Sequence, residues 1–205
     1  MPFNVNKLDC MLKKCGVDLP GVTKPMVYAG MYRAFFAYHT EDLNMFSINF
    51  LHHGSPKLWY AVPSAYAGRV ESLAKSLWPD EACPELLRHK TKLLSPMRLN
   101  QAGIPVWRGV QQQGEIMITW PESFHSGFNA GFNLAESVNF VPPSLWRFFL
   151  PFARTARVCR CVRPFASKTD AQAAETRLHL DQRGLARARV QARRPARPGR
   201  LGFDQ

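Results

Sequence analysis

The sequence contains no long apolar run, and this absence disfavours a helical membrane protein. No apolar stretch in the 205 residues approaches the roughly 20 residues of a transmembrane helix. The N-terminal residues Met1-Pro2-Phe3-Asn4 also lack the basic region and apolar block of a secretory signal. We therefore expect a soluble intracellular protein, and a hydrophobic content of 46% predicts one domain with a substantial core.

Cysteine is scarce as well, which argues against a disulfide framework. The five cysteines are an odd number in a chain without a secretory signal, so metal ligands or buried thiols are expected instead. Cys10 and Cys15 lie in the stretch from Asn4 to Cys15, whose apolar residues recur at helical spacing. We expect a short amphipathic helix there, with Asn4 or Asn6 as its N-cap and both thiols as packing or surface groups.

Acidic residues are few, and the shortage is concentrated near the C-terminus. The chain has 27 Lys and Arg against 15 Asp and Glu, and the segment from Arg154 onward alone carries a net charge of +9 out of +12. Large apolar residues are also rare there, so we expect residues 166–205 to be disordered, apart from a transient helix around 171–180. We place the domain boundary between residues 163 and 164. The basic tail either contacts nucleic acid weakly through phosphates or is simply solvated.

The part before this tail alternates short β-like runs with turn signals. Strands are expected within residues 26–38, 46–52, 57–62, 104–113, 115–119 and 131–140, with a hairpin-type break at Gly54-Ser55-Pro56. Helical insertions are expected from Ser64 to Leu77, after Pro84, from Ser95 to near Gly103, and from Pro143. Many short strands with helical insertions predict a mainly β fold, a small β-barrel or jelly roll whose mouth can hold a metal.

The residues most indicative of chemistry are His39-Thr40-Glu41-Asp42, at the end of an aromatic run. On an extended strand the side chains of His39 and Glu41 leave by the same face while Thr40 turns away. A second imidazole is available at His125, which follows another strand-like run. Two imidazoles and one carboxylate on one face are the triad of non-haem Fe(II) oxygenases, with positions left open for a co-substrate and dioxygen. A solvated strand face carrying this pattern by chance is the alternative, and spacing alone does not decide between them.

A second cluster combines residues far apart in the chain. Cys83 and His89 lie in one short helical segment, and Cys159 and Cys161 lie near the end of the globular part. Three thiolates and one imidazole satisfy a tetrahedral structural Zn(II) with no open position. Such a site would tie the terminal helix to the insertion between the strands. Either pair alone is better explained by packing residues, but together they account for every cysteine after the first helix.

Five long motifs run through the chain. They are Pro25 to Met31, Phe36 to Asp42, Ser47 to His52, Pro56 to Tyr60 and Gly114 to Phe140. Together they resemble the JmjC domain of histone lysine demethylases. The pattern of Cys83, His89, Cys159 and Cys161 is similar to the additional zinc site of the trimethyl-lysine demethylases that combine JmjN and JmjC segments. The resemblance covers residues 4 to 161.

This resemblance implies a double-stranded β-helix, the cupin-like jelly roll of the family, with a structural zinc site. Fe(II) is expected on His39, Glu41 and His125, and 2-oxoglutarate is the expected co-substrate. By position in the family motifs, Lys57 forms the ion pair with the distal carboxylate of 2-oxoglutarate, and Asn49 hydrogen-bonds the co-substrate. The residues expected to line the same pocket are Phe36, Trp59 and Thr119.

The methylated substrate is expected in a polar cage whose oxygen atoms receive the N-methyl groups through weak C–H···O contacts. The residues at these positions are Gly21, Tyr28, Glu41, Ser137 and Asn139, with Val138 beside the methyl groups and Lys90 on the dioxygen side. The implied reaction removes methyl groups from tri- or dimethylated lysine 9 or lysine 36 of histone H3 and releases formaldehyde, succinate and CO2. The implied partners are the histone H3 tail and chromatin, and the implied location is the nucleus.

The sequence also departs from the family pattern. A tyrosine that bonds the distal carboxylate of 2-oxoglutarate, and the JmjN segment, would both lie before Met1. Met26 stands where a cage tyrosine is usual, and Val138 replaces a threonine. We expect loss of the tyrosine to weaken co-substrate binding by roughly 1.5 to 3 kcal/mol. The alternative functions are therefore a non-catalytic chromatin scaffold and a 2-oxoglutarate-dependent protein hydroxylase.

Overall fold

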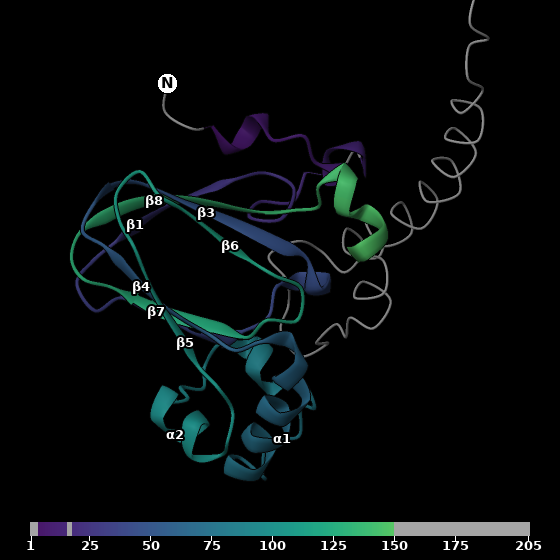
Figure 1. Ribbon diagram of the computed structural model, residues 1–205, viewed down its shortest axis with the longest axis vertical. Coiled ribbons are helices and arrows are strands. Elements are labelled where there is room, and N and C mark those ends of the chain that lie inside the picture. The colour runs from purple at the N-terminus through teal and green to yellow at the C-terminus, as the bar shows by residue number, and fades with distance from the viewer. Residues whose placement is uncertain (1–3, 16–17, 150–205) are drawn as a thin grey trace, which may run out of the picture.

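The computed structural model describes residues 4–15 and 18–149, and its strands form two facing four-stranded sheets (Figure 1). The first sheet has the order β1-β8-β3-β6, made of Met26–Gly30, Asn133–Phe140, Phe46–Gly54 and Ile116–Thr119. The second has the order β2-β7-β4-β5, made of Phe35–His39, His125–Asn129, Lys57–Ala61 and Trp107–Gln111. All paired strands described are antiparallel.

Successive strands mostly cross from one sheet to the other, which is the arrangement of a jelly roll. Among the eight described strands, only β4 and β5 follow each other within one sheet, and the helical insertion joins them. The mainly β fold predicted from the turn signals is confirmed. The hairpin predicted at Gly54-Ser55-Pro56 is wrong, because β3 and β4 lie in different sheets and this turn carries the chain across.

The insertion between β4 and β5 covers the outer face of the second sheet (Figure 1). Its helices are η4 (Ser64–Tyr66), α1 (Ala67–Leu77), η5 (Leu86–His89) and α2 (Pro96–Gln101). Ser95 caps α2 as predicted, since its Oγ accepts a hydrogen bond from the Met97 backbone N–H. The α-helix α1 begins later than the predicted start at Ser64, because Tyr66 is its N-cap and Ser64 lies in the preceding 3-10 turn. Within the described residues, every helix is too short or too polar to cross a membrane.

The N-terminal segment forms two 3-10 helices, η1 (Val5–Lys7) and η2 (Met11–Cys15), so the single amphipathic helix predicted there is wrong. Asn4 does cap η1, because its Oδ1 accepts from the Asn6 backbone N–H at 2.9 Å. The N-terminal segment forms two short helices because it makes hydrogen bonds to the chain that follows β8. Val141 accepts from the Met11 backbone N–H at 2.9 Å and donates its own N–H to the Cys10 Sγ. These tertiary contacts outweigh the local helical preference.

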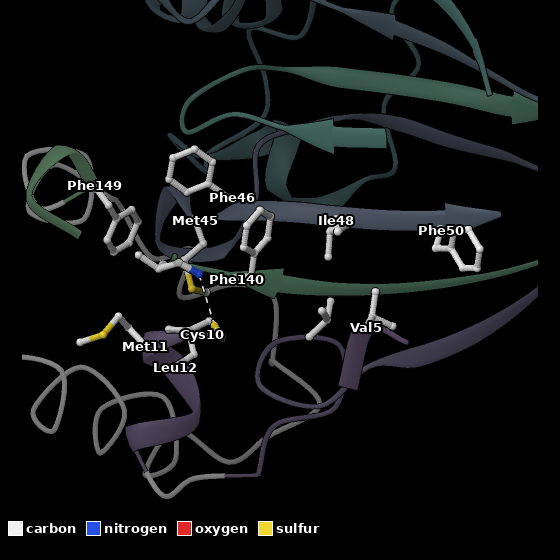
Figure 2. Packing of buried hydrophobic residues seen from close by; sticks show 12 residues of the cluster. Val5, Cys10, Met11, Leu12, Met45, Phe46, Ile48, Phe50, Phe140 and Phe149 are labelled. Atoms are coloured by element: carbon white, nitrogen blue, oxygen red, sulfur yellow. Dashed lines mark hydrogen bonds between the residues drawn. The ribbon is translucent and has the colours of Figure 1, made fainter. Parts of the chain in front are cut away.

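Strand β3 is buried on both faces, and the two faces differ in chemistry. Its even-numbered residues Phe46, Ile48 and Phe50 pack beneath the N-terminal segment in an apolar cluster (Figure 2). Because side chains alternate along a strand, Ser47 and Asn49 face the opposite way, toward the space between the sheets. A second apolar cluster lies under α1 and η5, outside the other sheet. Apolar cores therefore cover the outer faces of both sheets, and polar residues line part of the interior.

Candidate metal centre

Strand β2 contains a β-bulge that turns its side chains toward the interior. It pairs with β7 through Phe36↔Gly127 and next through His39↔His125, so β2 has one extra residue between these pairs. The bulge places Phe36 and His39 on the same face, which strict alternation would forbid. Their ring centroids lie 6.2 Å apart, and the Phe36 ring packs edge-on against Trp59 at 4.9 Å.

The structure brings His39, Glu41 and His125 together where β2 ends and β7 begins. The two imidazole centroids lie 4.4 Å apart, and Glu41 Oε1 lies 3.3 Å from His125 Nε2. One ligand atom from each residue lies within 4.8 Å of the other two. Thr40 lines a cavity of about 220 Å³ with Phe124, so it turns away from the triad as the spacing predicted. Among the described residues, these three form the one cluster with the geometry of a metal site.

Hydrogen bonds orient each member of this triad. The Nδ1 of His39 lies 2.7 Å from the Ala37 carbonyl, and the Nδ1 of His125 lies 2.9 Å from the Ser123 carbonyl. A carbonyl only accepts, so both Nδ1 atoms carry a proton, and in the neutral form of each imidazole the Nε2 lone pair is the one that can bind a cation. The carboxylate is held as well. Asn139 Nδ2 donates to Glu41 Oε2 at 3.0 Å.

The electrostatics favour the forms of the triad that bind a cation. Burial lowers the pKa of His39 to about 3, with the charges of His125 and Lys90 adding to the effect and Glu41 opposing it. Burial acts to raise the pKa of the Glu41 carboxyl, but hydrogen bonding and charge from His125, with smaller effects from His39 and Asn139, hold it below its usual range. Near neutral pH the site therefore has a neutral His39 imidazole and an ionised carboxylate.

A buried lysine lies on the neighbouring strand β4. Lys57 is 7% exposed, and its Nζ donates to Asn129 Oδ1 at 2.7 Å and lies 5.9 Å from the centre of the Phe36 ring. Burial lowers its pKa. No carboxylate of residues 4–15 or 18–149 forms an ion pair with it. A buried ammonium without an anion is costly, so this position fits an anionic ligand.

The predicted pocket residues surround this part of the interior. The Trp59 ring packs against Phe36 and lies 6.0 Å from that of His125, and its Nε1–H donates to Gln111 Oε1 at 2.9 Å. Gln111 in turn donates to the Asn49 backbone carbonyl at 3.0 Å. The side-chain Oδ1 of Asn49 is buried without a hydrogen-bond partner in the described part of the chain. An amide oxygen only accepts, so this atom fits a hydrogen-bond donor of a ligand or of a water molecule.

Thr119 lies on the same interior wall as Asn49. Its Oγ1 lies 2.8 Å from Ser47 Oγ, within hydrogen-bonding distance, and the two residues are cross-strand partners on β6 and β3. Both are buried. The residues predicted to line the pocket therefore come from strands of both sheets, and they are Phe36, Asn49, Lys57, Trp59 and Thr119.

Most of the predicted cage positions also lie together. The Gly21 carbonyl accepts from the Asn139 backbone N–H at 3.2 Å, and β1, which carries Tyr28, pairs with β8, which carries Ser137 and Asn139. Burial raises the pKa of Tyr28, and the charge of Glu41 raises it further, so the phenol lies within electrostatic reach of the triad. Tyr28 is 45% exposed, which leaves this side of the triad open to solvent.

Val138 does not join these residues, contrary to the prediction. It is 5% exposed and packs in the outer apolar cluster with Val5 and Ile48. Strand alternation puts it on the face of β8 opposite to Ser137 and Asn139. We therefore leave Val138 out of the candidate cage.

The predicted zinc ligands are only partly described. Cys83 is buried just before η5, and His89 is the last residue of η5. Cys159 and Cys161 lie outside the described residues, as does the basic tail. Lys90 is exposed and caps η5 in a left-handed conformation with a φ of 56°.

Two further polar residues of the interior, Gln111 and Asn129, were not predicted from the sequence. Both are direct cross-strand neighbours of Lys57, one on β5 and the other on β7. Gln111 is 1% exposed and Asn129 is 6% exposed. A polar residue inside a predicted strand was a signal for Gln111, whereas Asn129 lies between the predicted strands 115–119 and 131–140. Their meeting at Lys57 depends on strand order, which local pattern does not contain.

Residues 26–140, the stretch that carries the triad, match the family model described as JmjC domain, hydroxylase. The chain belongs to the JmjC family. Its JmjC relatives include lysine-specific demethylase 4D of Rattus norvegicus, 44% identical over 155 residues, and probable lysine-specific demethylase 4F of Homo sapiens, 44% identical over 156 residues. Lysine-specific demethylase 4B of Mus musculus is likewise 44% identical over 156 residues.

Each alignment covers 75% of this chain, but the chain spans only 30%, 24% and 14% of the lengths of these three relatives, respectively. The JmjC family implies Fe(II) and 2-oxoglutarate as metal and co-substrate. Three residues of this chain fit that implication, since the possible ligand atoms of His39, Glu41 and His125 lie within 4.8 Å of one another. The buried Lys57 ammonium fits the anionic co-substrate.

Proposed function

We propose that this JmjC domain is an Fe(II)- and 2-oxoglutarate-dependent demethylase of tri- and dimethyl-lysine on histone H3, with lysine 9 and lysine 36 as target sites. The observation that carries the proposal is the convergence of His39, Glu41 and His125, whose ligand atoms lie within 4.8 Å of one another. The three relatives described above are named lysine-specific demethylases, which supports the choice of a methylated lysine as substrate.

The iron would be held by the Nε2 atoms of His39 and His125 and by the Glu41 carboxylate. Bound Fe(II) would supply the oxidation, in which 2-oxoglutarate and dioxygen are consumed, a methyl carbon is hydroxylated, and succinate, CO2 and formaldehyde are released. The protein would orient the groups that bind the iron. The Ala37 and Ser123 carbonyls keep both imidazoles in the tautomer that can bind a cation.

The co-substrate would bind beside the triad, between Lys57 and Asn49. Lys57 would meet the distal carboxylate of 2-oxoglutarate, which supplies the anion that this buried ammonium lacks among the described residues. Asn49, which is buried, would donate a hydrogen bond from its Nδ2 to the same molecule, because the oxygens of 2-oxoglutarate only accept. Phe36 and Trp59 would exclude water from one side, and Thr119 would line the polar wall.

The methylammonium group would enter from the open side of the triad. The cage would consist of Gly21, Tyr28, Glu41, Ser137 and Asn139, whose oxygen atoms favour polarised N-methyl groups. Lys90 would contribute positive charge near His39, consistent with its effect on the pKa of that imidazole. Hydroxylation of a methyl carbon needs no nitrogen lone pair, so trimethyl-lysine is an allowed substrate.

The proposal has further parts that concern the rest of the chain. Cys83, His89, Cys159 and Cys161 would bind a structural Zn(II) that joins the end of the domain to the insertion. The methylated H3 tail in chromatin would be the partner, the nucleus the location, and the Arg-rich tail would make weak contacts with nucleic acid.

Mass spectrometry of methylated H3 peptides tests this function directly. Peptides trimethylated at lysine 9 or lysine 36 would be incubated with the protein, Fe(II), ascorbate and 2-oxoglutarate. The expected result is methyl loss that requires 2-oxoglutarate and disappears in His39→Ala. His53→Ala is the matched control, because His53 is an exposed histidine on β3 outside the triad.

Two outcomes would contradict the proposal. Folded protein that carries iron but removes no methyl group from any peptide would favour a chromatin scaffold. Oxidation of a peptide without methyl loss would favour a protein hydroxylase.

A further inference from the structure

The side chain of Arg88 connects the loop that carries Glu41 to the turn that leads into His125. Its Nη1 donates to the Glu41 backbone carbonyl at 3.4 Å, and its Nη2 donates to Asn44 Oδ1 at 3.2 Å. Asn44 Nδ2 then donates to Glu122 Oε1 at 3.2 Å. Glu122 lies in the turn just before His125. A chain of hydrogen bonds therefore runs from the loop after His39 to the loop before His125.

Both loops contain residues in left-handed backbone conformations, which the surrounding structure has to hold in place. Leu43 and Asn44 have φ values of 51° and 50°, and Glu122 has a φ of 59°. Residues other than glycine seldom adopt this left-handed region, and they keep it when the surrounding structure holds them. Asn44 is 5% exposed, so its amide is held within the protein. The Arg88 network contacts this turn directly beside Glu41.

Arg88 is itself held in one orientation. Its Nε donates to Glu85 Oε2 at 3.3 Å, and the two side chains are 15% and 8% exposed. A guanidinium presents several donors in a fixed plane, so it can bond three acceptors at once. A lysine ammonium at the same place has no such plane. Arg88 also lines the cavity of about 220 Å³, so a shorter or uncharged side chain there would meet no steric obstacle.

We propose that Arg88 is a positioning residue for the metal centre. It acts through the backbone of Glu41 and through Asn44, and it aligns the carboxylate of the first loop with the imidazole of the second. The inference rests on the proposed metal site. Groups that orient metal ligands contribute strongly to affinity, and their removal commonly weakens metal binding by about 10 to 100-fold.

Cobalt binding measures this role without any enzymatic turnover. Co(II) would be titrated into iron-free protein that retains Zn(II), so that the proposed cysteine cluster is already filled, while the visible absorption bands are recorded. We expect Arg88→Met to weaken Co(II) binding by about 10-fold or more and to change the band shape, which reports ligand geometry. Arg88→Lys should restore the charge but not the affinity. Arg69→Met is the matched control, because Arg69 bonds the Ala102 carbonyl and packs over Tyr66, and it should leave binding unchanged.

A second variant tests the inference if Arg88→Met does not fold. Asn44→Gly keeps the left-handed backbone without strain while it removes the amide that connects Arg88 to Glu122, and it should also weaken Co(II) binding. Unchanged affinity and spectrum in folded Arg88→Met, or in Asn44→Gly if the first variant does not fold, would overturn the inference. If the native protein bound no Co(II), the proposed metal site would be wrong and the inference would be overturned with it.

Discussion

His39 and His125 are cross-strand partners on β2 and β7, with ring centroids 4.4 Å apart, although they lie far apart in the sequence. Their distance is therefore set by the pairing register of the second sheet and by the bulge in β2. A slip of one residue would send one imidazole to the opposite face. The candidate metal centre therefore depends on this register.

Gly127→Ala should disrupt the register beside the triad. A Cβ at Gly127 would lie 2.1 Å from the Leu58 carbonyl oxygen and 2.6 Å from the Phe36 ring. We expect a loss of about 3 kcal/mol in the free energy of unfolding, measured by urea denaturation. Gly68→Ala in α1 is the control, because its Cβ would meet no atom within 4 Å, and it should add about 0.5 to 1 kcal/mol. Equal stability of the two variants would contradict the tight approach at Gly127.

Lys57→Met should weaken 2-oxoglutarate binding by at least about 10-fold, since a charge-assisted hydrogen bond contributes about 1.5 to 3 kcal/mol. It should leave the stability of the ligand-free protein unchanged or higher, because it removes a buried charge that has no ion pair among the described residues. Calorimetric titration and urea denaturation measure the two effects. Lys92→Met is the control, as Lys92 pairs with Glu81 and should not affect 2-oxoglutarate. Unaltered co-substrate affinity in Lys57→Met would count against the proposed pocket.

The metal-free protein should lose stability as the pH falls below 6.5. The pKa of His39 is lowered to about 3 in the folded state by burial, whereas the unfolded chain takes up this proton near pH 6.5. Between these values the unfolded state binds more protons, so His39 reduces the free energy of unfolding by up to about 1.4 kcal/mol per pH unit as the pH falls.

Urea denaturation in the presence of a chelator, at several pH values from 7 to about 5, measures this slope. His39→Asn should flatten it, whereas His53→Asn should not, because His53 is exposed. A slope that is the same in all three proteins would show that His39 titrates normally.

Leu12→Ala should destabilise the domain by about 2 to 5 kcal/mol, because Leu12 is 2% exposed in the outer apolar cluster (Figure 2). Leu93→Ala is the control, because Leu93 is 60% exposed and its truncation should change stability by less than about 0.5 kcal/mol. Thermal or urea unfolding distinguishes the two. A mild effect of Leu12→Ala would mean that the N-terminal 3-10 helices are not integral to the fold.

Much of the candidate site could be predicted because its signals are local. The spacing of His39 and Glu41 places two side chains on one face of an extended chain whatever the rest of the fold does. The short strands and the Ser95 cap are local signals of the same kind. The single N-terminal helix was wrong because bonds from Val141 override local preference at Cys10 and Met11.

The sequence by itself determined the mainly β fold, the spacing of His39 and Glu41 and the strand that carries Lys57. Only the tertiary structure decided that Gly54-Ser55-Pro56 crosses between sheets, that Val138 faces the outer core, and that Gln111 and Asn129 flank Lys57. The physical reason is the distance along the chain between the residues that set each feature. Side-chain direction along a strand follows from neighbouring residues, whereas strand order and register follow from long-range burial and hydrogen bonding, which no short window of the chain contains.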